Sequence, residues 1–398
     1  MVIGSRHHRN FSPLADARVS VFSDLITGAK TDSISVQFQY NVAPEDVQMA
    51  TTGSGEIKQE NSQAIIETGT DAVASADLRT TKSVRYRPGH EGFAQFTTLF
   101  TTDNNNKGIE DTSQLAGIFN DDNGYYLGFM DEKFIVGRRR EGEDIVVEQQ
   151  NFNLDTLDGG NNSDYKPNFS NMNVYRIRFG WLGSAPISFE ILDNNGRWVE
   201  FHRMAINDVL PSVGNPVLPI RLVANKVDGA ENIEMKTASL NGGVIGEINE
   251  SANRYKSFDN TKEDLTGNEI SAVFNLRSKE EFFNKENLVG VHQLFMSVGL
   301  DGGGKFTVVR VIRNATLVDT PNWQEVDEFN SVVEYDTQAT DVEGGEVLLS
   351  FVIGASGKQT LDISNYFVDM LGGETLSFTV EPFVGADASI SVRWQEEF

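Results

Sequence analysis

Strict alternation of apolar and polar residues is the feature that most limits how this chain can fold. In residues 33–40 (SISVQFQY) the apolar side chains share one face: Ile34, Val36, Phe38 and Tyr40. The same period of two recurs in residues 175–179 (YRIRF), 187–191 (ISFEI) and 388–394 (ASISVRW). Successive side chains of a β-strand point to opposite faces, so each segment is predicted to be a half-buried strand. Arg176, Arg178 and Glu190 would then lie on solvated faces.

Turn signals separate these segments and long helical patterns are missing. Asp-Gly and Asn-Gly pairs, such as Asp228-Gly229 and Asn241-Gly242, supply the backbone conformations that tight hairpins need. Residues 306–312 are apolar on both faces and predict a central strand. Only Ser278–Asn287 begins like a short helix, because Ser278 and Glu281 resemble a capping box. The predicted fold class is therefore all-β, with sandwiches or barrels as the architecture.

The charge balance and the lack of cysteine exclude several classes of protein. The chain has 33 basic and 58 acidic residues among 398, which gives a net charge of −25. Such acidity argues against binding nucleic acid through its phosphates and against adsorption to an anionic membrane. Without cysteine there is no disulfide framework, thiolate zinc site or cysteine nucleophile. We find no apolar run long enough to span a membrane and no secretory signal, so we expect the chain to remain in the cytosol or leave by lysis.

One polar stretch divides the chain. From residue 248 to residue 268 the strand pattern lapses into a sequence that is polar and poor in β-branched residues. We predict an N-terminal arm at 1–14, a β-sandwich at 15–247, a linker at 248–268 and a second, smaller β-sandwich at 269–398. The arm is basic (RHHR at 6–9), so one hypothesis is that it binds an acidic surface of a partner protein. The alternative is that it is a disordered tail.

Catalytic motifs are absent from the sequence. Paired carboxylates of a sandwich glycosidase need even spacing to share a strand face, whereas Glu143 and Glu148 are five residues apart. No Gly-x-Ser-x-Gly turn supports a serine triad. The five histidines show no metal-ligand spacing and are interpreted as structural. The glycine-rich residues 299–305 (GLDGGGK) lack the phosphate-loop spacing and are interpreted as a hairpin loop.

Three oxygen-rich loops leave structural calcium open as an alternative. They are residues 103–106, 120–123 and 193–195, which are rich in Asp and Asn. None has the spacing of an EF-hand, and Asp and Asn side chains also stabilise turns unaided. We therefore predict no catalytic, cofactor or metal site, with structural calcium as the one exception to be tested.

Aromatic side chains offer a site for sugar. An aromatic plane packs against the C–H face of a sugar ring, and we single out Trp181, Tyr125 and Tyr126 as glycan-binding candidates. Trp181 lies between two glycines, Gly180 and Gly183, where an aromatic would be displayed at a strand end. The alternative is that these rings are core, as most large aromatics of a β-sandwich are.

Several segments taken together resemble one group of proteins. They are residues 85–91 (RYRPGHE), 124–140 (GYYLGFMDEKFIVGRRR), 174–204 (from VYRIRFGWLG to FHRM), 218–226 (LPIRLVANK) and 232–243. This order resembles the structural proteins of tailed bacteriophages and related large DNA viruses. Towards the C-terminus, VGVHQLFMSVG, VVRVIRNATL and ASISVRWQEEF resemble the small β-sandwich that often closes such proteins.

The resemblance implies a fold, a role and partners. It implies a concanavalin-A-like (lectin-like) jelly-roll sandwich followed by a smaller β-sandwich. It also implies a non-enzymatic virion structural protein, such as a capsid decoration, head fibre or tail-associated component, assembled in the host cytoplasm. The expected partners are other virion proteins and further copies of the chain, with no nucleic acid and no membrane. The alternative function is a module of the virion that binds a host-surface glycan or receptor, and a polysaccharide-degrading enzyme is a third hypothesis.

Overall fold

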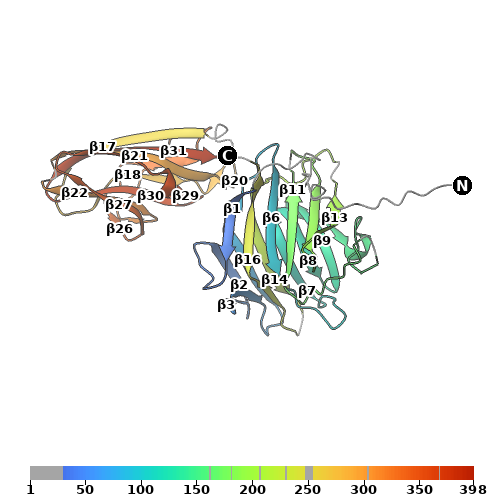
Figure 1. Cartoon of the computed structure of the whole chain (residues 1–398). Helices are drawn as coiled ribbons and strands as arrows, with labels where there is room; N and C mark the ends of the chain where they lie inside the picture. Colours follow the sequence, from blue (N-terminus) through green and yellow to red (C-terminus); the bar gives the residue numbers. More distant parts are fainter. Residues whose placement is uncertain are drawn as a thin grey trace. The chain divides into compact units, whose positions relative to one another are not determined.

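The structure is a computed structural model that describes residues 30–160, 163–180, 182–205, 208–228, 231–246, 254–302, 304–366 and 368–398. The chain separates into two compact units, residues 1–248 (unit 1) and 249–398 (unit 2) (Figure 1). The predicted arm at 1–14 and the candidate Trp181 lie outside the described residues. No helix in the described ranges is long and apolar enough to cross a membrane.

Unit 1 is built on two large antiparallel sheets. The first has six strands in the spatial order β1 (Lys30–Gln37), β16 (Ser239–Ile245), β6 (Glu91–Thr98), β11 (Asn173–Phe179), β12 (Ile187–Leu192) and β13 (Trp198–Met204). The second has seven strands in the order β10 (Glu143–Glu148), β9 (Lys133–Arg140), β8 (Asn123–Met130), β7 (Thr112–Phe119), β14 (Leu218–Lys226), β5 (Ala74–Val84) and β2 (Val47–Thr52). A third, small sheet joins β15 (Glu234–Thr237), β4 (Gln63–Glu67) and β3 (Glu56–Glu60).

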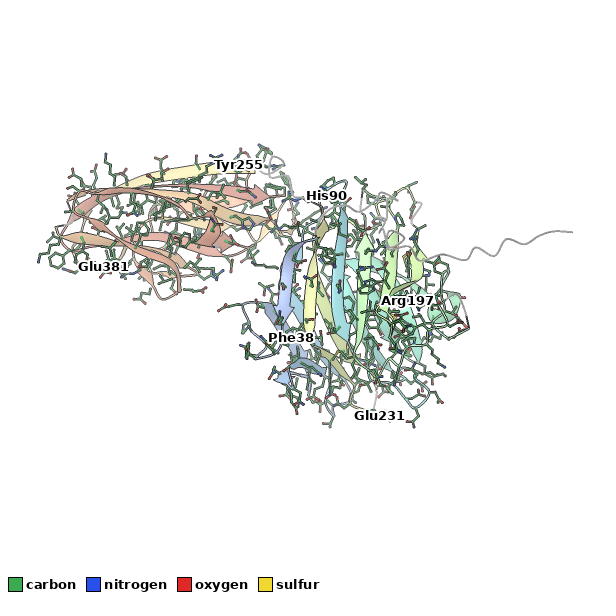
Figure 2. The ribbon with its side chains drawn as sticks, in the orientation of Figure 1. Phe38, His90, Arg197, Glu231, Tyr255 and Glu381 are labelled. Carbon is green, nitrogen blue, oxygen red and sulfur yellow. The ribbon has the colours of Figure 1, made fainter. Side chains whose placement is uncertain are left out.

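The core of unit 1 lies between the two large sheets and follows the alternation in the sequence. Ile34, Val36 and Phe38 are all buried there, as predicted, while Tyr40 lies beyond the end of β1 and is 84% exposed. Figure 2 labels Phe38 in this core. The facing sheet contributes Leu78, Leu127 and other apolar side chains to the same cluster. Two antiparallel sheets packed face to face around one core form the predicted concanavalin-A-like jelly-roll sandwich.

Unit 2 is a second, smaller sandwich. One sheet joins β17 (Arg254–Leu265), β31 (Ala386–Glu397), β21 (Gly290–Gly302) and β28 (Lys358–Asp362), and β29 (Asp369–Met370) also pairs with β21. The other joins β24 (Gln324–Glu325), β25 (Val333–Asp336), β18 (Ser271–Ser278), β30 (Thr375–Pro382), β22 (Phe306–Arg313) and β27 (Glu346–Gly354). Two two-stranded pairs are β19 (Glu281–Phe282) with β20 (Lys285–Glu286), and β23 (Thr316–Leu317) with β26 (Val342–Glu343). The predicted alternation of Ile390, Val392 and Trp394 is confirmed, since all three are buried in one core.

Three local predictions need correction in unit 2. The predicted linker at 248–268 is too long, because residues 254–265 form β17, which pairs along its length with β31. The predicted short helix at 278–287 is wrong, because those residues contain the β19–β20 hairpin, whose turn places Phe283 and Asn284 at positive φ. β22 pairs on both sides, as expected of residues 306–312, but only one of its faces is fully buried.

Candidate functional site

The two tyrosines singled out from the sequence are buried in unit 1. Tyr125 faces the core with 1% of its surface exposed, and its hydroxyl group lies 2.8 Å from the hydroxyl of Ser212. Burial raises the pKa of Tyr125, so the ring stays neutral. Tyr126, the next residue along β8, lies on the opposite face of the sheet but is fully buried as well. The structure therefore corrects the prediction for both: neither ring offers an open plane to a sugar.

Tyr126 belongs to a closed apolar cluster on the outer face of the seven-stranded sheet. It packs with Leu115, Phe119 and Ile135, apart from the main core. The guanidinium of Arg139 lies over the cluster, 5.6 Å from the centre of the Tyr126 ring. The cross-strand neighbours of Tyr126 are both glycines, Gly117 and Gly137, which give its ring room to lie against the sheet. A cluster sealed in this way stabilises the sheet rather than exposing a binding surface.

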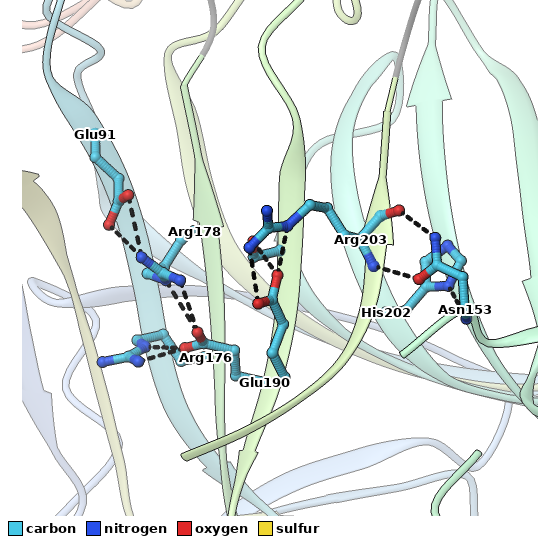
Figure 3. Close-up of polar contacts among 9 residues, drawn as sticks. Glu91, Asn153, Arg176, Arg178, Glu190, His202 and Arg203 are labelled. Atoms are coloured by element: carbon cyan, nitrogen blue, oxygen red, sulfur yellow. Dashed lines mark hydrogen bonds and ion pairs between the residues drawn. The ribbon is translucent and has the colours of Figure 1, made fainter. Parts of the chain in front are cut away.

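The outer face of the six-stranded sheet carries a buried ion network (Figure 3). The carboxylate of Glu190 pairs with the guanidinium groups of both Arg176 and Arg178. Arg178 also pairs with Glu91, at 3.2 Å between Nη1 and Oε2. These four residues are between 2% and 8% exposed, so the prediction that Arg176, Arg178 and Glu190 lie on solvated faces is wrong.

Pairing across strands explains why these charges can be buried. Arg176 and Glu190 are directly opposite on β11 and β12, and the ring of Trp198 lies 4.0 Å from the guanidinium of Arg176. Burying a charge costs less when each charge has an opposite partner with hydrogen bonds. The sequence does not predict this pairing, because alternation indicates only which residues of one strand share a face.

Further polar contacts involve side chains of β13. Glu200 accepts a hydrogen bond from the Ser188 hydroxyl and pairs with Arg203, at 2.6 and 2.8 Å. The backbone N–H of Asn153 donates to Nδ1 of His202 at 3.3 Å (Figure 3). Burial lowers the pKa of His202, which matches a neutral ring that accepts this hydrogen bond.

The two carboxylates considered for catalysis, and the two of the buried ion network, are either paired or exposed to solvent. Glu143 and Glu148 lie on the edge strand β10, where the first is exposed and the second is 2.6 Å from Nζ of Lys133. Glu190 and Glu91 are both paired with arginine. A glycosidase needs two carboxyl groups that flank the bond to be cleaved, one as acid and the other as base or nucleophile. These four residues do not provide that pair.

The oxygen-rich loops use their own oxygens for turns. Oδ1 of Asp103 accepts backbone N–H bonds from Asn105 and Lys107, both at 2.8 Å. Asp193 does the same in its loop and also binds the Arg197 side chain. Within the described ranges, no group of three or more His, Asp or Glu side chains is placed to hold a metal ion.

A polar hollow lies between two loops of unit 1. Its volume is about 420 Å³, and it is lined by Thr102, Asp103, Asn104, Asn106, Lys166, Pro167, Asn168 and Ser170. The first loop follows β6 and the second precedes β11, so neighbouring strands of one sheet bring them together. The lining offers hydroxyl, amide, carboxylate and ammonium groups and is mostly polar. Only part of this hollow is signalled by the sequence, as the oxygen-rich residues 103–106.

Side-chain hydrogen bonds hold the two loops of the hollow together. The Asn106 side-chain amide donates to the carbonyl of Pro167 at 2.9 Å and accepts from the N–H of Phe169 at 2.8 Å. The hydroxyl groups of Thr102 and Ser170 lie 2.5 Å apart. Asn104 and Lys166 have exposed side chains at the same hollow. The shape of the hollow is thus set before any ligand enters it.

Comparison with known proteins gives likenesses to solved structures only. No family model and no curated protein matches the chain. The legume lectin-like domain from Entamoeba histolytica is 12% identical over 52% of this chain and 95% of its own, with a TM-score of 0.33. Endo-1,3-beta-glucanase from Streptomyces sioyaensis is 12% identical over 55% and 97%, with a TM-score of 0.39.

A third likeness spans more of the chain. A structure of botulinum neurotoxin type C, whose cell entry depends upon interaction with two ganglioside molecules, is 10% identical over 88% of this chain and 93% of its own. Its TM-score is 0.35. At these identities and scores, none of the three assigns a ligand, a reaction or a family to this chain.

Proposed function

We propose that this protein is a non-enzymatic carbohydrate-binding module, exposed on a virion, that binds a host-surface glycan in the polar hollow of unit 1. The observation that carries the proposal is the composition of that hollow. Seven of its eight lining residues have polar side chains, and they surround about 420 Å³. Sugars present many hydroxyl groups, each both a donor and an acceptor, so a dense set of polar side chains suits them.

The pre-formed shape of the hollow favours binding. Asn106 links the two loops through a donor and an acceptor hydrogen bond. A site that is ordered before binding loses less conformational entropy when a ligand arrives. Asp103 adds an acceptor whose pKa lies below its usual range because backbone N–H groups of the loop bind it, so it is ionised at neutral pH. The amide of Asn104 and the ammonium of Lys166 add donors.

The virion context rests on the resemblance described from the sequence. Residues 85–91, 124–140 and 174–204 supply most of it. Strong acidity, at −25, would keep many assembled copies soluble and away from the packaged nucleic acid. A purely structural role in the capsid or tail is the second candidate, and the same resemblance favours it.

A glycan array with the labelled full-length protein tests the proposal. We expect retention on a limited set of glycans, confirmed by titration calorimetry in solution. The double variant Asn104→Ala/Lys166→Ala should weaken binding by about tenfold or more, because it removes two polar contacts at exposed positions. The matched control Asn194→Ala/Lys358→Ala removes the same two residue types at exposed positions outside the hollow.

Two results would overturn glycan binding at this hollow. One is an array without retention at high protein concentration, which would favour the structural candidate. The other is binding that the Asn104→Ala/Lys166→Ala variant retains in full, which would place the site elsewhere. The control variant should bind like the unaltered protein, and hydrolysis of any retained glycan would contradict the non-enzymatic part of the proposal.

A further inference from the structure

Strand β27 ends the six-stranded sheet of unit 2 with an unusually apolar edge. It pairs with β22 on one side and is the last strand of its sheet in the described part of the chain (Figure 1). From Val347 to Gly354 its sequence is VLLSFVIG, without charge and without proline. A free strand edge presents a row of backbone N–H and C=O groups, so such a strand is a template for pairing.

Two other edge strands of the protein, β17 and β10, carry charges that oppose such pairing. β17, at the edge of the second sheet of unit 2, contains Arg254, Lys256, Asp259 and further charges over twelve residues. β10, at an edge of unit 1, has three acidic residues among six. Charged side chains are a common protection of exposed edges. β27 lacks that protection over eight consecutive residues.

The core beside β27 is also incomplete. Leu349 and Phe351 face the core of unit 2, opposite Val311 and Val309, yet both are only partly buried. On the other face, Val352 is 58% exposed. A further strand added at this edge would cover the two core-facing side chains and satisfy the free backbone groups.

We propose that a second copy of this chain supplies that strand, by antiparallel pairing of β27 with β27 of the other copy. The sequence of the strand is complementary to itself when Ser350 faces Ser350. Leu349 of one copy then faces Phe351 of the other, and the two core faces lie on the same side of the joined sheet. A register shifted by one residue would place core-facing against outward-facing side chains. A two-fold axis through Ser350 gives a closed dimer.

Charge favours this edge for contact between two copies. At −25, copies of the chain repel one another over most of their surfaces. The repulsion is weakest where residues 347–354 carry no charge. The acid at the start of the strand, Glu346, is paired with Arg313 at 2.6 Å. Glu346 lies at the far end of the strand from the axis, beyond a β-bulge at Leu348, so the two acids stay apart.

Analytical ultracentrifugation of the full-length protein tests the dimer. We expect a concentration-dependent dimer for the unaltered chain. Ser350→Glu places two like charges opposite each other at the axis and should raise the dissociation constant about tenfold. Ser350→Lys should do the same. Mixing the two variants puts opposite charges at the axis and should restore the dimer, a result that only a contact of Ser350 with Ser350 explains.

A matched control is available on the charged edge strand. Ser257 is exposed on β17 and faces Arg393 on β31, so Ser257→Glu introduces the same charge in the same unit without harming the fold. This variant should dimerise like the unaltered protein. The proposal is overturned if the unaltered chain stays monomeric at high concentration, if Ser350→Glu leaves the dimer unchanged, or if the mixed variants remain monomeric.

Discussion

The imidazole of His292 and the carboxylate of Asp369 lie on paired strands of unit 2, with Nδ1 2.7 Å from Oδ1. The other ring nitrogen, Nε2, lies 3.3 Å from Oε2 of Glu397, on β31. Burial opposes a charge on the ring, but hydrogen bonds and attraction from the two carboxylates outweigh it and raise the pKa of His292 to about 9. His292 is therefore a cation at neutral pH, held between two strands.

His292→Gln should destabilise unit 2 at low pH and not at high pH. The pKa of His292 lies above its ordinary 6.5, so the ion pairs stabilise fully below about pH 6.5 and are lost as the pH rises through about 9. At pH 6 we expect unit 2 to lose about 1–2 kcal/mol of unfolding free energy, a modest loss because water reaches part of the ring. At pH 10 we expect no loss of unfolding free energy. Urea unfolding at both values checks this, and an equal loss at both would contradict it.

His202 supplies a control, because its pKa is shifted in the opposite direction to that of His292. Burial lowers its pKa, so the folded state favours the neutral ring and loses stability as the pH falls below 6.5. In an NMR titration, the imidazole signal that disappears in His202→Gln should titrate below pH 6.5. The signal that disappears in His292→Gln should titrate near pH 9. Two signals that titrate together near 6.5 would contradict both assignments.

The alternation of the sequence predicted the core well, for a physical reason. A strand with one solvated face has a period of two, and Ile390, Val392 and Trp394 obey it. The charged residues at 176, 178 and 190 follow the same period, yet their face is buried. Glu190 meets Arg176 across the consecutive strands β11 and β12, but Glu91 reaches Arg178 from β6, 87 residues away in the sequence. Patterns within one segment do not contain that information.

The candidate site was harder to predict than the core. The hollow needs Asn106 and Phe169, 63 residues apart, to meet between neighbouring strands. The burial of Tyr126, a glycan-binding candidate in the sequence, depends on glycines of two other strands. In both cases the decisive neighbours come from the register of the sheet. An oxygen-rich loop at 103–106 was the only signal in the sequence that touched the hollow.

Removal of calcium should leave the melting temperature unchanged. The Asp103 and Asp193 carboxylates accept backbone N–H bonds of their own loops, so a cation would have to displace those bonds. A ligand that binds only the folded state raises stability, and its loss would show as a lower melting temperature. We expect a change of less than about one degree between excess EDTA and excess calcium. A lower melting temperature in EDTA that added calcium restores would support a structural calcium site.

Gly137→Ala should destabilise unit 1 through Tyr126. A methyl group at residue 137 would collide with the outer atoms of the Tyr126 ring, which is fully buried and has little room to move. We expect a loss of about 1–3 kcal/mol in urea unfolding and a change in the near-ultraviolet circular dichroism of tyrosine. In a Tyr126→Leu background the same substitution should cost less. Gly299→Ala is the control in unit 2, because nothing lies within 4 Å of the added methyl group.

Glu190→Gln should cause the largest loss among these substitutions. The change keeps the size of the side chain but removes the charge that Arg176 and Arg178 share, and these arginines are 4% and 8% exposed. Arg178 retains Glu91 and Arg176 retains the ring of Trp198, but both lose the carboxylate that they share. Breaking a buried ion pair from one side leaves an uncompensated buried charge. We therefore expect unit 1 to lose about 3–5 kcal/mol of unfolding free energy.

A Glu→Gln substitution at an exposed ion pair separates the effect of burial on stability from the effect of charge. Glu148→Gln removes the partner of Lys133 on the edge of the seven-stranded sheet, where the side chains are 33% and 62% exposed. Water already solvates this pair, so its loss should move the urea midpoint far less than Glu190→Gln. Equal shifts for the two variants would show that the Arg176–Glu190–Arg178 network is solvated in solution. A larger shift at Glu190 that high salt does not reduce would show that water is excluded from it.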